Sequence, residues 1–334
     1  MSHAIPWSNP GLWASLIYIP EGFVMLAGNL LIVLTVFFHS ALRSDKVYLT
    51  VAFLALADAL NGWCYFAAGS YRSHLLITGA LNGTYTAWQC LLTPHNFLWV
   101  FSQPCASLML LIVSIDRLVC VVSTLKYIAF SKYYAYCLCG SAYAYSLLST
   151  GAAYGFGYAD SFKEHRYSKI CLTSQAVEPL FYPFFGYSRI LFAVSSVVLY
   201  AVIALVLKRK QNKVAAATTN QGVLYSVQRQ NKITKTLGIS CLFTTFLFVI
   251  PLLVSNTLSL VRIRSGDRGS SAIGTMVPLI GYVLANVNPI LNLFLLLKRH
   301  REIRVGLKAL FKCKRLAADT RLWGETVARA ATKQ

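Results

Sequence analysis

Charged side chains interrupt two long apolar runs in this sequence. Asp58 follows the apolar stretch LALA, and Asp116 and Arg117 stand side by side within LMLLIVSIDRLVCVV. A charge inside a lipid bilayer costs roughly 2.5 to 3.5 kcal/mol unless it finds a partner or reaches the interface. The chemistry open to these residues is therefore charge pairing. Asp116 and Arg117 can neutralise each other, whereas Asp58 must face protein or trapped water.

Composition is typical of a membrane protein. Of the 334 residues, 56% are hydrophobic and 13% are charged, whereas soluble domains carry about 25% charged residues. The formal net charge of +20 would suggest nucleic-acid binding in a soluble protein. In a membrane protein the same excess arises when Lys and Arg gather on one side of the bilayer. The positions of the charges decide between these interpretations.

Seven apolar segments are long enough to cross a hydrocarbon core of roughly 30 Å as helices. They are residues 16–38, 47–70, 90–122, 134–158, 184–207, 233–258 and 271–297. We therefore predict an all-α membrane protein with a seven-transmembrane helix bundle. The fourth segment is rich in Gly, Ala, Ser and Tyr, and its small residues at Gly140 and Ala144, and at Gly151 and Gly155, predict close packing against another helix.

Seven spans put the two termini on opposite sides, and the basic residues indicate which side is which. Of the Lys and Arg residues, 23 fall on the side of the C-terminus and 8 on the side of the N-terminus. Because basic residues gather on the cytoplasmic side, we expect an extracellular N-terminus and a cytoplasmic C-terminus in the plasma membrane. Nucleic-acid binding then loses its main support.

Three residues on the expected outer side agree with this orientation. Asn82 begins the sequence Asn-Gly-Thr, which is a glycosylation sequon. Cys90 and Cys171 are the only cysteines in the predicted outer loops or at their edges, where oxidising conditions favour a disulfide. The alternatives are a sequon that is not used and two free thiols; we favour the disulfide.

An ordered set of motifs accompanies the seven spans. The first span contains GNLLIV, the second LALAD, the third ends in SIDRL, the seventh ends in NPILN, and a basic amphipathic stretch follows. This set resembles a rhodopsin-like (class A) G-protein-coupled receptor over about residues 16–315. Within that family the chain looks most like the nematode serpentine chemoreceptors of class sx.

The resemblance implies a switch at the cytoplasmic side of the bundle. In the family, the arginine that matches Arg117 is held by local ion pairing, here with Asp116, and faces the G-protein once the sixth helix moves outward. The other matching switch residues are Tyr200, Asn288 and Pro289. Taken alone, Arg117 has a simpler interpretation as an interfacial arginine whose stem lies along lipid.

The resemblance also implies a polar cluster within the bundle, formed by Asn29, Asp58 and Asn288. In many members of the family this cluster holds a sodium ion. Ala106 stands where the family often has a serine ligand, although Ser107 is adjacent. We therefore expect the polar cluster and assign no metal to it.

Family positions further indicate a ligand pocket in the outer half of the bundle. The matching residues are Trp99, Gln103, Leu252, Asn256 and Tyr282. Trp99 stands where amine receptors have an acid, so a cationic amine is not the expected ligand. The seventh span has no lysine, which argues against a retinal Schiff base. Each of these residues could instead be an ordinary core residue.

The segment after the seventh span has the pattern of a helix on a membrane surface. Ile303, Leu307 and Leu310 recur at helical spacing, with basic residues on the other faces. Cys313 beside them is a candidate for palmitoylation or an unmodified thiol. We divide the chain into an extracellular N-terminus (1–15), a receptor domain (16–297), this amphipathic helix 8 (298–315) and a disordered cytoplasmic tail (316–334).

The expected function is chemosensory: a small-molecule or peptide ligand binds within the bundle, and the receptor activates a heterotrimeric G-protein. A transporter or channel would also explain Asp58, but it would usually show more polar groups in the membrane or repeated halves. A non-signalling decoy receptor is the third alternative. We expect no enzyme and no cofactor, because the sequence shows no nucleophile, metal-ligand or phosphate-loop motif.

Overall fold

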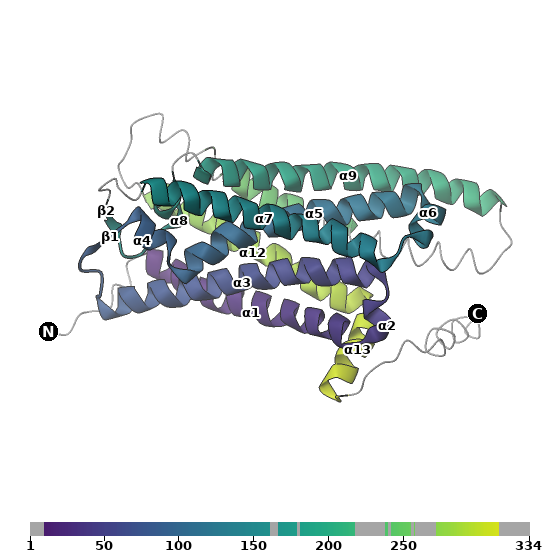
Figure 1. The fold of residues 1–334 in the computed structure, drawn as a ribbon, viewed down its shortest axis with the longest axis horizontal. Helices are drawn as coiled ribbons and strands as arrows, with labels where there is room; N and C mark the ends of the chain where they lie inside the picture. Colours follow the sequence, from purple (N-terminus) through teal and green to yellow (C-terminus); the bar gives the residue numbers. More distant parts are fainter. Residues whose placement is uncertain are drawn as a thin grey trace.

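Long helices lie together in one elongated bundle (Figure 1). The computed structural model describes residues 10–160, 166–178, 181–217, 238–239, 242–254, 257 and 272–313. The long helices in these ranges are α1 (Pro10–Phe38), α3 (Lys46–Thr78), α5 (Pro94–Val122), α7 (Lys132–Asp160), α9 (Phe181–Ala217) and α12 (Ala272–Arg299). The prediction of an all-α bundle is confirmed.

Short elements connect the long helices at the two ends of the bundle (Figure 1). One end carries α4 (Ala87–Leu91), α8 (Thr173–Ala176), β1 (Thr84–Thr86) and β2 (Arg166–Ser168). The two strands pair antiparallel, with Thr84 opposite Ser168. The other end carries α2 (Ser40–Arg43), α6 (Thr124–Ala129) and α13 (Arg301–Phe311). We call these the strand end and the α6 end.

Five of the described helices are long and apolar enough to cross a membrane, and they lie in α1, α3, α5, α9 and α12. Leu191 and Leu205 of α9 are 62% and 63% exposed, as a face toward lipid requires. α7 has 29 residues, but its Gly, Ala, Ser and Tyr content lowers its hydropathy. The sixth predicted span is described only in part and contains a π-helix, η1 (Thr244–Val249).

Close helix packing occurs between α1 and α3 rather than at the glycines of α7 for which it was predicted. A Cβ added to Gly62 would lie 2.5 Å from the backbone nitrogen of Leu26 and 2.9 Å from the carbonyl oxygen of Gly22. Only glycine allows two helices to approach this closely. At Gly140, as at the other glycines predicted to pack closely in α7, an added Cβ would meet nothing within 4 Å among the described residues. That prediction was wrong.

Two predicted positions also need correction. Cys90 does not belong to the third span, because it lies in the separate helix α4 and α5 begins at Pro94. Proline is favoured in the first turn of a helix, where its missing N–H is not needed. Arg189 was counted among the charges of the outer side, yet it lies within α9 and is only 2% exposed. The orientation argument is not weakened, because that side then has fewer basic residues.

Helix α13 packs against α1 and α2 at the α6 end of the bundle. His39 Nε2 lies 2.7 Å from the carbonyl oxygen of Gly306, and Ile303 is fully buried. Arg301, Arg304 and Lys308 are exposed. The helix therefore has the amphipathic character that the sequence predicted, with its apolar face on α1 and α2.

Candidate functional site

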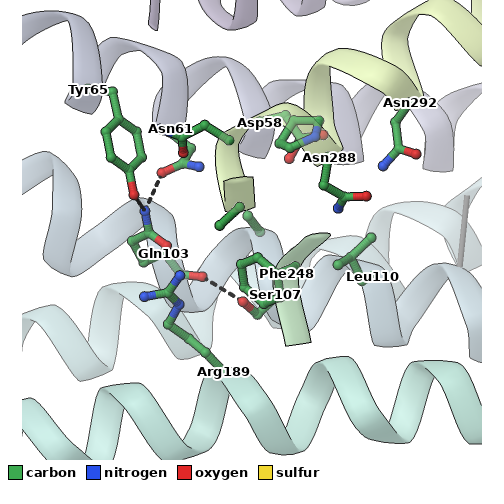
Figure 2. Close-up of a pocket in the computed structure, with 14 residues that line it drawn as sticks. Asp58, Asn61, Tyr65, Gln103, Ser107, Leu110, Arg189, Phe248, Asn288 and Asn292 are labelled. Carbon is green, nitrogen blue, oxygen red and sulfur yellow. Dashed lines mark hydrogen bonds between the residues drawn. The ribbon is translucent and has the colours of Figure 1, made fainter. Parts of the chain in front are cut away.

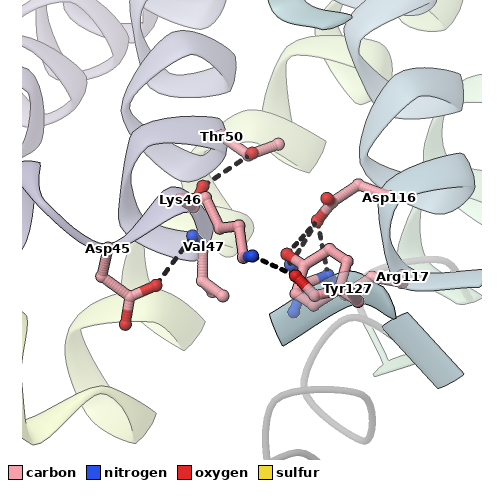
Figure 3. Close-up of polar contacts among 7 residues, drawn as sticks. All are labelled: Asp45, Lys46, Val47, Thr50, Asp116, Arg117 and Tyr127. Carbon is pink, nitrogen blue, oxygen red and sulfur yellow. Dashed lines mark hydrogen bonds and ion pairs between the residues drawn. The ribbon is translucent and has the colours of Figure 1, made fainter. Parts of the chain in front are cut away.

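A buried ion pair lies near the end of α5 (Figure 3). Arg117 Nε donates to Asp116 Oδ2 at 3.0 Å, and Arg117 Nη2 donates to the same oxygen. Asp116 is fully buried and Arg117 is 2% exposed. The local ion pairing that the resemblance implies for Arg117 is therefore present, with Asp116 as its partner.

Tyr127, from α6, completes this cluster (Figure 3). Its hydroxyl oxygen accepts from Arg117 Nη2 at 3.0 Å, and its hydroxyl donates to Asp116 Oδ2 at 3.4 Å. Burial raises the pKa of Tyr127 well above its ordinary range, so the hydroxyl keeps its proton. No sequence motif marks Tyr127; the only signal is a tyrosine in the short segment that follows Arg117.

Lys46, at the start of α3, fastens Tyr127 in place (Figure 3). Its Nζ donates to the carbonyl oxygens of Tyr127 and Phe130, the latter at 2.8 Å. The same nitrogen lies 4.4 Å from the centroid of the Tyr127 ring, which is within the range of a cation–π interaction. The preceding residue, Asp45, caps α3. Lys46 of α3 and Arg117 of α5 therefore both contribute to holding the Tyr127 side chain in this position.

The cluster retains unused bonding capacity. Arg117 Nη1 and Asp116 Oδ1 are buried and have no hydrogen-bond partner among the described residues. Unpaired buried polar atoms are costly, so a new partner for either group would be favoured. The arrangement is chemically suited to exchange: Arg117 can be held by Asp116 and Tyr127, or it can leave them for another acceptor.

The other predicted switch residues lie on neighbouring helices. Tyr200 of α9 packs with Val121 of α5 in a small apolar cluster near the α6 end. Asn288 Oδ1 accepts from Thr244 Oγ1 at 3.2 Å, which joins α12 to η1. Pro289 lies in the wall of the central cavity described next. These residues therefore do not contact Arg117 through any of the described bonds.

A small cavity of about 20 Å³ lies inside the bundle (Figure 2). This volume is enough for one ordered water. The lining residues come from α3, α5, α9, η1 and α12, and they are Asp58, Asn61, Tyr65, Gln103, Ala106, Ser107, Leu110, Arg189, Phe248, Ala285, Asn286, Asn288, Pro289 and Asn292.

The predicted polar cluster is only partly assembled. Asp58 and Asn288 both line the cavity. Asn29 does not, and its side-chain amide donates to the carbonyl oxygen of Met25 in its own helix at 2.9 Å. Asp58 is 7% exposed and has no hydrogen-bond or ion-pair partner among the described residues. A carboxylate in this position requires water or an ion from the cavity.

Gln103 organises the wall of the cavity toward the strand end (Figure 2). Its Nε2 donates to Asn61 Oδ1 at 2.6 Å and to the Tyr65 hydroxyl at 3.2 Å. These bonds connect α5 to two successive turns of α3. Ser107 Oγ donates to the backbone carbonyl of Gln103 at 3.1 Å. Of the four predicted ligand residues that the structure describes, Gln103 is the one that lines this cavity.

Two of the other predicted ligand residues, Trp99 and Tyr282, lie around an aromatic cluster. The ring of Trp99 stacks on Tyr182 with centroids 5.9 Å apart. The hydroxyls of Tyr182 and Tyr282 lie 3.2 Å apart. Leu252 packs with Ile190 in a separate small apolar cluster. Asn256, the remaining residue of the predicted set, lies outside the described residues.

Comparison with known families decides what kind of bundle this is. A family model described as serpentine type 7TM GPCR chemoreceptor Srsx matches residues 22–311. The chain belongs to this family. The match extends from α1 through α13 and includes both the central cavity and the cluster around Arg117. No curated protein matches the chain.

At its strand end the chemoreceptor carries the predicted disulfide between Cys90 and Cys171. The bond ties α4 to the segment that follows β2. Arg72 of α3 strengthens this connection, because its Nη2 donates to the carbonyl oxygen of Cys171 at 3.1 Å. The side-chain amide of Asn96 donates to the same oxygen at 3.2 Å. The strand end is therefore fastened to both α3 and α5.

The predicted modification sites of the chemoreceptor are both accessible. Asn82 is exposed in the turn before β1. Cys313 is an exposed free cysteine immediately after α13. The two sites lie near opposite ends of the bundle, so the geometry is compatible with a sugar on one side of a membrane and a lipid on the other.

Arg189 is, with Tyr127, a residue of the site that the motif analysis did not assign. It lies in the central cavity (Figure 2), with its guanidinium carbon 5.3 Å from the ring centroid of Phe248 and 5.8 Å from that of Trp99. A signal was present in the sequence, because Arg189 interrupts an apolar span. A basic residue inside a span marks functional sites as an acid does.

Proposed function

We propose that this chemoreceptor detects a small extracellular ligand inside its helical bundle and activates a heterotrimeric G-protein. The observation that carries the proposal is the buried cluster of Asp116, Arg117 and Tyr127 at the α6 end. A ligand cavity and a charge cluster at separate levels of one bundle are the two parts that a transmembrane signal requires. The family assignment favours a receptor over an enzyme.

The switch would be a two-state element. In the state described here, Arg117 is held by Asp116 and Tyr127. In the signalling state, its guanidinium leaves them and meets the G-protein. A ligand drives this change only if it binds the second state more tightly than the first. Arg117 should consequently be required for coupling and not for ligand binding.

Substitution of Arg117 tests the proposal without a known ligand. Arg117→Ala and Arg117→Lys are expressed in cells, and basal recruitment of a G-protein is measured by energy transfer at equal surface expression. We expect Arg117→Ala to abolish recruitment and Arg117→Lys to reduce it, because an ammonium cannot reproduce the planar fork of a guanidinium. Arg43→Ala, an exposed arginine near the same end, is the control. A lysine variant indistinguishable from wild type would instead support a plain interfacial anchor.

We further propose that the strand end is extracellular and the α6 end cytoplasmic, in the plasma membrane. The excess of basic residues toward the C-terminus supports this orientation. Asn82 would then carry a glycan, and Cys313 would lie beside the inner leaflet, with α13 as an interfacial helix and residues 316–334 as a cytoplasmic tail. Glycosidase treatment should lower the apparent mass of wild type and leave Asn82→Gln unchanged. A C-terminal tag accessible in intact cells would contradict the orientation.

The two alternative functions, a transporter or channel and a decoy receptor, predict different responses in cells. A transporter or channel would give ligand-dependent flux or current without any G-protein. A decoy receptor would give neither flux nor a second messenger. Cells that express the chain with a calcium or cyclic-nucleotide reporter, screened against volatile, peptide and metabolite panels, distinguish the three. A response that requires both ligand and G-protein is the expected result.

A further inference from the structure

Arg189 presents an unpaired positive charge in the middle of the bundle. The residue is 2% exposed, and its Nε has no hydrogen-bond partner among the described residues. Figure 2 shows its guanidinium rising from α9 toward Gln103 of α5. A guanidinium stays protonated inside proteins, so the charge must be balanced by its surroundings.

The surroundings do not supply a matching acid. Asp58 lines the same cavity, and Glu21 accepts from Asn286 Nδ2 at 3.1 Å. No ion pair joins either carboxylate to Arg189 in the described part of the chain. The nearest stabilising groups are the ring faces of Trp99 and Phe248. Ring faces attract a cation, but they do not satisfy the hydrogen-bond donors of a guanidinium.

A further donor faces the same cavity. The Tyr65 hydroxyl accepts from Gln103 Nε2, and its own proton makes no hydrogen bond with the described residues. An acceptor with negative charge would therefore find a fixed cation and a nearby hydroxyl donor. A carboxylate has the planar geometry that a guanidinium binds through two parallel hydrogen bonds.

We propose that Arg189 forms an anion-binding subsite that takes the carboxylate group of a small organic acid. The inference rests on the proposed chemoreceptor function and names the class of its ligand. The cavity in the described state has room for one water, so the acid would bind a state in which α9 has moved away from α5. Its apolar part would lie toward Trp99 and Phe248, whose rings flank the guanidinium. Arg189 is the only basic residue among the described lining residues, so a second carboxylate would find no cation there. The site should therefore prefer monocarboxylates to dicarboxylates.

Thermal unfolding of the purified full-length receptor in lipid nanodiscs tests the proposal. The probes are butyrate, its neutral isostere butyramide, the dicarboxylate succinate, and chloride, all at constant sodium concentration. Butyrate should raise the unfolding temperature of wild type, whereas butyramide and succinate should not. An equal shift with butyramide would overturn the proposal from wild type alone. An equal shift with chloride would show an inorganic-ion site and overturn the assignment to an organic acid.

Variants then locate the site. Arg189→Gln removes the charge and should weaken the apparent affinity for butyrate by at least about tenfold, the loss expected for a charge-assisted pair. Arg189→Lys keeps the charge but loses the fork, so its affinity should be intermediate. Arg166→Gln, an exposed arginine of β2, is the matched control and should respond as wild type does. Unchanged butyrate affinity in a folded Arg189→Gln variant would place the anion elsewhere.

The two proposals fail separately. The nanodisc assay contains no G-protein, so the absence of a butyrate effect would leave coupling through Arg117 untouched. Unchanged recruitment in the Arg117 variants would contradict the coupling proposal and would equally leave the anion subsite standing. Together, the cell assay and the nanodisc assay therefore assign any failure to one of the two sites.

Discussion

Removing one hydroxyl group from the cluster at the α6 end should raise basal signalling. Tyr127→Phe deletes the acceptor that Arg117 Nη2 reaches at 3.0 Å and a longer bond of 3.4 Å to Asp116. The ring that Lys46 covers at 4.4 Å is retained. A hydrogen bond to a charged group contributes about 1.5 to 3 kcal/mol. Because Nη2 keeps its bond to Asp116, the lower value applies, and about 1.4 kcal/mol corresponds to a tenfold change in an equilibrium.

The measurement is basal G-protein recruitment in cells, normalised to surface expression, and the expected rise is up to about tenfold. Tyr134→Phe is the matched control, because its ring packs edge-on against Tyr127 while its hydroxyl makes no hydrogen bond with the described residues. Ligand-free thermal stability is recorded alongside, since a general loosening would also lower it. If Tyr127→Phe and Tyr134→Phe give the same basal signal, the hydroxyl does not restrain Arg117 and the reasoning is wrong.

Three further predictions concern stability. Gly62→Ala should destabilise the receptor by about 1 to 3 kcal/mol through forced separation of α1 and α3, whereas Gly140→Ala, with open space around it, should be neutral or slightly stabilising in thermal unfolding. Cys90→Ser should cost about 4 kcal/mol by the chain-entropy argument for a separation of 81 residues, and reduced wild type should match it; an unchanged unfolding temperature would contradict this. Gly306→Ala, whose new Cβ would lie 2.8 Å from Thr35 Cγ2, should lower hydrogen-exchange protection in α13 and leave α9 unaffected.

Local patterns in the sequence predicted the fold well because membrane helices are specified by composition and length. The errors arose where a boundary depends on a cap instead of on hydropathy. Cys90 was joined to the third span because the apolar run continues through it. The capping box at the start of α4, with Thr86 and Gln89 bonded to each other's backbone, and Pro94 at the start of α5 divide that run into two helices. Both signals were present in the sequence and were outweighed by hydropathy.

The contacts that residues of one helix make with another helix were much harder to predict from the sequence. Gly62 and Gly140 have the same side chain and lie in helices of similar length, yet only Gly62 has a backbone pressed against it. Asp58 and Gln103 were identified correctly as inward-facing groups, because a polar residue in a span must face protein. Which residue meets which could not be deduced in the same way. No motif marked Tyr127. The charge of Arg189 was visible in its span, but it could be assigned to the cavity only when α9 was placed against α5.

The geometry limits how a ligand bound in the cavity could affect Arg117. Gln103 and Arg117 are fourteen residues apart on α5, roughly 21 Å along the axis at 1.5 Å per residue. A close-packed helix does not transmit a signal by shortening, so the two ends communicate through displacement of one helix against another. α9 is suited to this role, because it carries Arg189 and, two turns later, Ser196, whose hydroxyl lies 2.6 Å from that of Ser114 on α5. An anion that joins Arg189 to the wall formed by Gln103 would change the fit of α9 on α5 at this serine pair, less than one turn before Asp116.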